Sequence, residues 1–359
     1  MEASLGVDLK NLEALGEGRP LDPFLPAFRT AFSMNIKFAR GFTPIHYLNY
    51  FSNLRDYKAF PKAVATMNER MDELIESTRN GEMGGDKSVL HSLLFDNSPA
   101  TSKKVALQNI KNQLVTLMVA GHETTAATMS FCLYHLANDK EAQERAAAEA
   151  RSVIGEKGHL TFSDAGNMPY ITACIRETLR LYSAVNLIQR EAAQDTLIET
   201  RSGENLRVSA KQKIYVVLRG LHINEKDFPE GLSWKPERFL GSNERHPNSY
   251  HPFGFGVRSC VGQFFALWEA KTCLAMMLDK FSISLPKGFK FEPTRGIGAS
   301  PFPRALSLGF SPRENPKLKP QASVPRSVDE VAPAAVAPAP AKAESDSPAV
   351  TIFYGSNGE

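Results

Sequence analysis

The stretch Phe253-Gly-Phe-Gly-Val-Arg-Ser-Cys-Val-Gly262 sets Cys260 in a glycine-rich loop, and an amphipathic helical pattern follows it directly. A thiolate there is stabilised by the helix N-terminus and by backbone N–H groups that point at sulfur. Gly256 and Gly262 let the backbone approach a large flat group closely, or take a positive φ. Arg258 stands two residues before the cysteine, where it can meet an anion on such a group. The spacing argues against a merely structural cysteine.

A second stretch, Ala120-Gly-His-Glu-Thr-Thr125, lies inside a long helical pattern from about residue 103 to residue 138. The pattern is apolar nearly all round at its centre, so we expect this helix to be buried within the domain. An acid and a hydroxyl are costly in such a place unless they serve chemistry, which makes Glu123 and Thr124 candidates for proton transfer. A zinc site of the HExxH type is excluded, because residue 126 is alanine.

The third stretch is Glu177-Thr-Leu-Arg180, a Glu/Arg pair three residues apart on a predicted helix. Taken alone, such a pair is most often a surface salt bridge of small energetic value. A further arginine, Arg238, follows in Pro236-Glu-Arg-Phe239.

Together the stretches resemble the cytochrome P450 family in order and spacing. The first matches F-x-x-G-x-R-x-C-x-G at every fixed position, and the second resembles the oxygen-activation motif (A/G)-G-x-(D/E)-T-T. The resemblance implies a haem whose iron is bound by the Cys260 thiolate. It also implies that Arg258 contacts a haem propionate, that Phe253 packs beside the sulfur, and that Gly256 and Gly262 give the backbone close access to the cofactor.

The resemblance assigns the other residues as follows. Thr124 donates a hydrogen bond to dioxygen, and Glu123 relays protons with water. Glu177 and Arg180 of the third stretch form, with Arg238, a buried structural network that clamps the Cys260 loop.

The substrate residues are inferred from the segment after Tyr182, which lies where the family's strand passes over the haem. Ala120, Val185 and Leu187 are therefore candidate walls of an apolar substrate pocket, with plain core packing as the alternative. Ser183 departs from the family, which commonly has proline after ExxR, so the motif itself stays intact while the next turn lacks that proline.

The composition of the chain excludes several classes of protein. The chain has 359 residues, 42% of them hydrophobic and 23% charged, and a net charge of +3, which excludes wholesale disorder and gives no reason to expect nucleic-acid binding. Its four cysteines show no CxxC pair, which excludes a disulfide scaffold and suits a reducing, cytoplasmic compartment. No apolar run approaches the length of a transmembrane helix, and no signal peptide is visible.

The remaining patterns predict a mainly α fold with a small β portion. The resemblance implies a cytochrome P450 fold that lacks its N-terminal part. We expect short strands near residues 196–200, 205–208 and 213–218, an extended stretch at 234–239 and a hairpin within 282–293. Amphipathic helical patterns cover residues 62–81, 141–155, 169–182 and 262–281.

The prolines indicate where the domain ends. We expect residues 313–348 to form a Pro/Ala-rich linker, since eight of the 23 prolines fall between residues 312 and 348. The resemblance implies that residues 1–312 are a partial haem domain. The stretch Ala349-Val-Thr-Ile-Phe-Tyr-Gly-Ser-Asn357 looks like the first strand and phosphate loop of a flavodoxin-like FMN domain, so residues 349–359 are taken as its truncated start. This order resembles the self-sufficient fatty-acid hydroxylases, whose haem domain is fused to a diflavin reductase.

The resemblance implies a haem-thiolate monooxygenase that uses O₂ to oxidise an apolar C–H bond of a small lipophilic substrate, a fatty-acid-like or polyketide-like chain of secondary metabolism. NADPH would supply electrons through the FMN and FAD of a reductase, in trans or lost from the chain. Two alternatives stay open: a haem-thiolate isomerase or dehydratase, and a non-catalytic truncated remnant. The intact acid–threonine pair argues against the first alternative.

Overall fold

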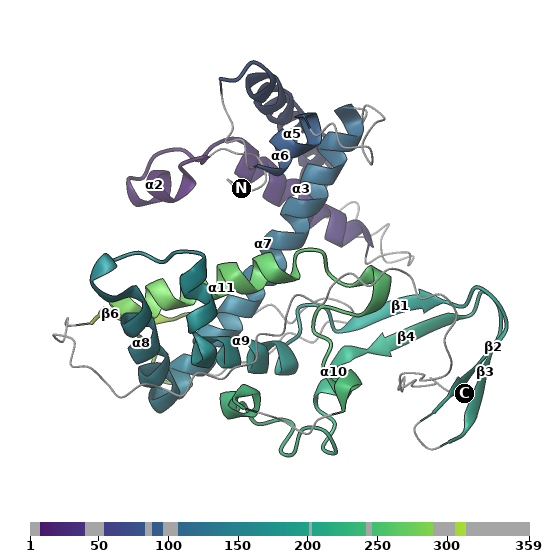
Figure 1. Cartoon of the computed structure of the whole chain (residues 1–359). Coiled ribbons are helices and arrows are strands. Elements are labelled where there is room, and N and C mark those ends of the chain that lie inside the picture. The colour runs from purple at the N-terminus through teal and green to yellow at the C-terminus, as the bar shows by residue number, and fades with distance from the viewer. Residues whose placement is uncertain are drawn as a thin grey trace. The chain divides into compact units, whose positions relative to one another are not determined.

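The computed structural model describes residues 8–39, 54–82, 88–95, 107–200, 203–241, 246–289 and 306–313. It divides into two compact units, residues 1–122 and 123–359, and the division falls within the long helix α7. Helices dominate and the strands are short, so the expected fold class is confirmed (Figure 1). The α-helices are α2 (Asn11–Gly16), α3 (Phe24–Ala39), α5 (Leu54–Arg79), α6 (Val89–Phe95), α7 (Leu107–Asn138), α8 (Lys140–Ile154), α9 (Pro169–Leu181), α10 (Leu218–His222) and α11 (Gln263–Lys280).

The described residues of the first unit form helices joined by turns and irregular segments, and none of them is in a strand. Along α5, Met67, Met71, Leu74 and Ile75 recur on one face and are all buried, as the apolar spacing predicts. The helix ends at Arg79, and Gly81 follows with φ +71°, a left-handed conformation that favours glycine as a stop. These side chains pack with those of α3, α6 and the first half of α7 into one core.

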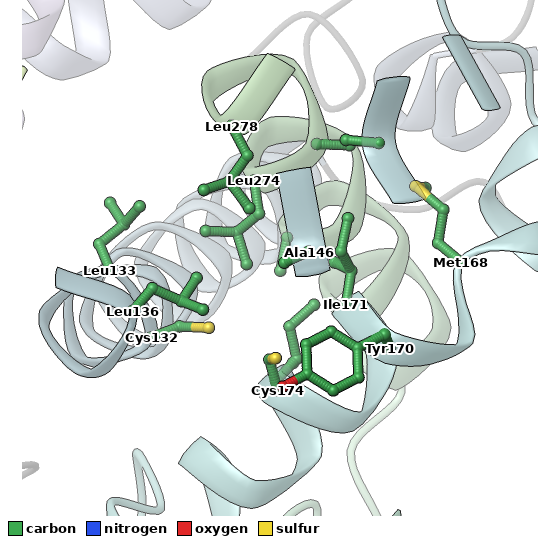
Figure 2. Packing of buried hydrophobic residues seen from close by; sticks show 14 of the residues in the cluster. Cys132, Leu133, Leu136, Ala146, Met168, Tyr170, Ile171, Cys174, Leu274 and Leu278 are labelled. Carbon is green, nitrogen blue, oxygen red and sulfur yellow. The ribbon is translucent and has the colours of Figure 1, made fainter. Parts of the chain in front are cut away.

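The second unit holds the larger core, and four helices contribute to it. Figure 2 shows side chains from the second half of α7 and from α8, α9 and α11 meeting in one cluster. Several members of the cluster are fully buried, which stabilises the fold by about 1.5–3 kcal/mol for each large apolar side chain. The labelled members are Cys132, Leu133, Leu136, Ala146, Met168, Tyr170, Ile171, Cys174, Leu274 and Leu278.

Among the described residues the strands form three antiparallel pairs, and arrows in Figure 1 mark strands of these pairs. The expected strands at 196–200, 205–208 and 213–218 are confirmed within a residue. The pairs are β1 (Leu187–Glu191) with β4 (Lys213–Val217), β2 (Thr196–Glu199) with β3 (Asn205–Val208), and β5 (Phe281–Ser284) with β6 (Gly309–Pro312).

The strand β5 pairs with β6, about 25 residues further along, and the second half of the hairpin expected within 282–293 lies outside the described residues. The expected extended conformation at 234–239 is wrong over its second part. Lys235 is extended, but the stretch Pro236–Phe239 is a 3₁₀ helix, because proline suits the first helical position. It is one of five 3₁₀ helices among the described residues: η1 (Gly155–Lys157), η2 (Ser163–Asn167), η3 (Pro236–Phe239), η4 (Pro247–Ser249) and η5 (Gly256–Arg258).

The helix α7 also differs from expectation at its centre. Buried side chains lie on either side of the centre, with Met118 before it in the first unit and Thr125 and Ala127 after it in the second. Between them Ala120 and His122 are exposed, and the acid and threonine that follow are half-buried. The stretch carries small and polar side chains, which have little apolar surface to bury, so the expected burial on all sides is wrong here.

Among the described residues, no helix combines the length and apolarity that a membrane crossing would need. The predicted linker, apart from Arg313, and the predicted flavodoxin-like start at residues 349–359 lie outside the described residues.

Candidate functional site

The cysteine loop, residues 253–262, is closed by its own backbone. The Cys260 N–H donates to the Phe253 carbonyl at 2.9 Å, and Ser259 N–H donates to the Gly256 carbonyl at 3.0 Å. Helix α11 begins three residues after the cysteine, with Gly262 at its N-cap. The Cys260 thiol is free and exposed. The loop therefore holds its sulfur at the surface of the second unit, next to a helix N-terminus.

The glycines of the cysteine loop have different roles. Gly254 and Gly256 have φ +73° and +69°, so both need glycine for the backbone path, and Gly254 is a residue that the sequence reasoning missed. Gly262 has φ −89°, so the backbone does not require glycine there. A Cβ on Gly262 would lie 3.9 Å from the Cys260 sulfur, which is ordinary contact.

Exposed apolar residues and an arginine lie close to Cys260 in the sequence. Four large apolar residues of the cysteine loop and of the first turn of α11 are exposed, and so many exposed apolar residues in one short segment are uncommon. They are Val257, Val261, Phe264 and Phe265. Arg258 is exposed as well, and makes no ion pair within the described part of the chain. This combination suits a cofactor with a large apolar face and anionic groups.

The strand β1 lies against the cysteine loop. A Cβ on Gly254 would lie 3.5 Å from Ile188 Cδ1, so β1 limits the space at that glycine. The Arg190 guanidinium lies over the Phe255 ring, 5.9 Å from its centroid. Arg190 thus adds a second cation beside the loop. The sequence reasoning missed it, because nothing in the strand's sequence indicates what the strand contacts.

The third stretch forms the expected buried network. Glu177 and Arg180 are both fully buried, and Arg180 donates through Nε and a terminal nitrogen to the two carboxylate oxygens, each at 2.8 Å. Arg238 Nε lies 3.3 Å from Glu177 Oε1, an ion pair without hydrogen-bond geometry. The structure therefore brings these three residues together, and a surface salt bridge is excluded.

Arg180 also holds three backbone carbonyls. It donates to His222 O at 2.8 Å, to Gly231 O at 2.6 Å and to Ser233 O at 2.9 Å. The Lys235 N–H donates to Glu177 Oε1 at 2.8 Å. Because these partners lie 42 to 58 residues away in the sequence, the network ties α9 to the chain between α10 and η3.

His222 extends this network to the cysteine loop. Its carbonyl accepts from Arg180, and its ring Nε2 accepts from the His251 N–H at 3.0 Å, two residues before Phe253. Burial, with the positive charge of Arg180, lowers the pKa of His222 to about 3, so the ring is neutral and can accept this bond. His222 is a further residue that sequence reasoning missed, since a lone histidine carries no motif.

Glu123 and Thr124 are half-buried on α7. The helix beyond them bonds locally, as in the Thr128 hydroxyl, which donates to the Thr124 carbonyl at 2.9 Å. The hydrogen bonds of His222 with Arg180 and His251 join the Glu177 network to the cysteine loop, and they involve neither Glu123 nor Thr124.

The candidate pocket walls lie on separate elements. Val185 is 44% exposed, and Leu187 is half-buried at the start of β1, where it pairs with Val217. Ala120 is exposed on α7 in the first unit. Ser183, where the family commonly has proline, is buried, and its hydroxyl donates to the Val185 carbonyl at 2.9 Å. That hydrogen bond closes the turn.

Haem fits the cysteine loop on these observations. The loop offers one accessible thiol at a helix N-terminus, exposed apolar side chains near it in sequence, and two arginines for anionic substituents. No group of three or more His, Cys, Asp or Glu side chains that could hold a metal ion occurs among the described residues, so an all-protein metal site finds no support there.

Comparison with known proteins agrees with this geometry. The family model for cytochrome P450 matches residues 15–300. The chain is 32% identical, over 87% of its length, to a self-sufficient cytochrome P450 monooxygenase of Oidiodendron maius (strain Zn). It is 30% identical, over 82% of its length, to a bifunctional cytochrome P450/NADPH–P450 reductase of Fusarium oxysporum. It covers only 29% and 28% of these two relatives.

Among solved structures, the chain resembles the heme domain of cytochrome P450DA, with a TM-score of 0.73 and 26% identity. The match covers 87% of this chain and 65% of that one. The resemblance to the haem domains of self-sufficient fusions is thus confirmed. The chain belongs to the cytochrome P450 family.

Proposed function

We propose that this chain is part of a haem-dependent monooxygenase and supplies the thiolate ligand of its iron. The enzyme inserts one atom of O₂ into an apolar C–H bond. The observation that carries the proposal is the Cys260 thiol, exposed at the start of α11 in a loop closed by the Cys260 N–H···O=C Phe253 bond. When bound, haem supplies the oxygen-activating redox chemistry. The overall reaction is balanced: the substrate, O₂, NADPH and one proton give the alcohol, water and NADP⁺.

The chain's own residues supply binding, orientation and proton transfer. Cys260 binds the iron, Arg258 and Arg190 hold the propionates, and Phe253 shields the sulfur from water. The buried network of Glu177, Arg180 and Arg238 keeps the loop in place through His222.

We assign proton transfer to Glu123 and Thr124. Thr124 donates a hydrogen bond to dioxygen, and Glu123 passes protons through water. A half-buried carboxylate suits this task, because it can reach both solvent and the interior.

The substrate and the electron source are proposed from the relatives. The names of two relatives join a P450 to an NADPH–P450 reductase or call the enzyme self-sufficient. We therefore assign NADPH, through FMN and FAD, as electron source, and a fatty-acid-like or polyketide-like chain as substrate, with Ala120, Val185 and Leu187 as apolar contacts. Residues 313–348 as linker and 349–359 as the start of a flavodoxin-like domain fit the same arrangement. The free cysteines favour a reducing, cytoplasmic compartment.

The test supplies the full chain with haem, NADPH, an added diflavin reductase and a long-chain fatty acid under ¹⁸O₂. We expect an alcohol that carries one ¹⁸O atom, and we expect Thr124→Ala to lose it while NADPH is still consumed. Thr116→Ala, an exposed threonine on the same helix, is the matched control and keeps the product.

Two results would contradict the proposal. Rearranged product without NADPH would indicate an isomerase or dehydratase. A chain that binds haem but forms no product from any long-chain acid or polyketide tested would indicate a non-catalytic remnant.

A further inference from the structure

We propose a second ligand site, for a small carboxylate with an aromatic body, in the cavity between α9, η3 and the first turns of α11. The cavity measures about 310 Å³, at the small end of the range for ligand pockets. All of its lining residues belong to the second unit. The inference stands independently of the proposed function.

Aromatic side chains form the walls. The Phe239 and Tyr250 rings lie 4.9 Å apart and tilted by 54°, and Phe253 adds a third ring. The Tyr250 hydroxyl donates to the Arg176 carbonyl at 2.9 Å, which fixes the Tyr250 ring on α9. Three rings held in this way suit a flat apolar body, because aromatic pairs gain from edge and offset contacts.

The polar groups at the cavity are uncommitted. Arg176 is exposed on α9, unlike its fully buried neighbours Glu177 and Arg180, and in the part of the chain that the structure describes its guanidinium makes no ion pair or hydrogen bond. The Gln263 side-chain amide, at the start of α11, makes none either over the same residues. A guanidinium and an amide beside aromatic walls form a donor set for a carboxylate.

His251 adds no charge to the cavity. It lines the cavity half-buried, with its ring against Phe255 at 5.2 Å. Burial lowers the pKa of His251, so the ring is neutral near pH 7 and adds no second cation. Arg176 is the one cation among the described lining residues, and Lys271 lies close enough that, after burial, the Arg176 charge lowers its pKa, so the surroundings of the cavity favour an anion.

The cavity is separate from the thiol. None of Cys260, Arg258, Arg190 or the α7 residues lines it. It shares only Phe253 and Gly254 with the cysteine loop. A ligand here therefore binds without coordinating the cysteine sulfur.

The test titrates fluorinated phenylacetate into the full chain and follows its ¹⁹F signal. We expect saturable binding, and Arg176→Gln should raise the Kd about tenfold, as the loss of one charge-assisted hydrogen bond implies. Gln263→Leu should raise the Kd by a smaller factor. Arg207→Gln, an exposed arginine on β3 outside the cavity, is the matched control and should leave the Kd unchanged.

Further arms separate this site from others. The neutral fluorophenylacetamide should bind at least tenfold more weakly, and Cys260→Ala should still bind the acid. The proposal is overturned if Arg176→Gln binds like wild type, if amide and acid bind equally, or if Cys260→Ala abolishes binding. Absence of saturation at millimolar ligand also overturns it.

Discussion

His135 on α7 is held between two rings. Its ring is stacked on Trp234, 5.0 Å away and 4° from parallel, and tilts against Tyr182 at 5.4 Å. Its Nε2 is buried and finds no hydrogen-bond partner among the described residues. Burial lowers the pKa of His135 to about 4, so the folded state needs the neutral ring.

This environment predicts a pH-dependent stability. The folded pKa of His135 lies below the unfolded value of about 6.5, so its contribution is complete above pH 6.5 and is lost as pH falls toward 4. Linkage gives about 2 kcal/mol lost between pH 7 and pH 5. His135→Phe keeps the stacking without a titratable group. Urea unfolding at pH 7 and pH 5 should show that the free energy of unfolding falls by about 2 kcal/mol less in the variant than in the wild-type protein. Equal falls in both proteins would contradict the assignment.

At Glu177 the charge itself is the stabilising feature. Glu177→Gln leaves the guanidinium of Arg180 buried without its counter-charge, so unfolding should become easier by about 3–5 kcal/mol. The matched control is Glu76→Gln, which breaks the exposed pair with Arg79 and should cost under about 1 kcal/mol. Chemical denaturation of both variants measures the difference. Similar small effects would show that the buried pair is not a clamp.

At the scale of elements, the cysteine loop offers a matched pair of glycines. Gly256→Ala forces an alanine to φ +69°, whereas Gly262→Ala places a methyl at ordinary contact from sulfur with φ −89°. The first should destabilise the chain by about 1–2 kcal/mol and the second by much less. Thermal unfolding compares the two variants. A larger loss for Gly262→Ala would contradict the backbone geometry.

A second element-scale link joins α8 to β5. The buried Gln143 amide donates to Ile283 O at 2.9 Å, and its Oε1 accepts from Ile283 N–H at 2.8 Å. Gln143→Met would leave both backbone groups unpaired, at a cost of about 1–3 kcal/mol for each group. Amide hydrogen exchange at Ile283 should speed up sharply in the variant, with Leu274 on α11 as the internal reference. Unchanged exchange would exclude the link.

Across the whole molecule, the sequence predicted what is local and missed what is distant. The cysteine loop and most helix bounds follow from spacing within one segment. The buried network of Glu177, Arg180 and Arg238 was implied by the family resemblance, since spacing alone favoured a surface salt bridge. Arg190, His222 and the partner of β5 depend on segments that meet only after folding, and no local pattern marks them. The centre of α7 was expected to be buried because its apolar count is high, yet its small and polar side chains leave it partly exposed.

The assignment of Cys260 as the haem ligand is checked by the reduced CO-difference spectrum of the purified chain after haem is supplied. We expect the red-shifted Soret band of a thiolate-bound haem, absent from Cys260→Ala and retained in Cys273→Ala, a half-buried cysteine on α11. No haem uptake by the wild-type chain, or the same band in Cys260→Ala, would contradict it.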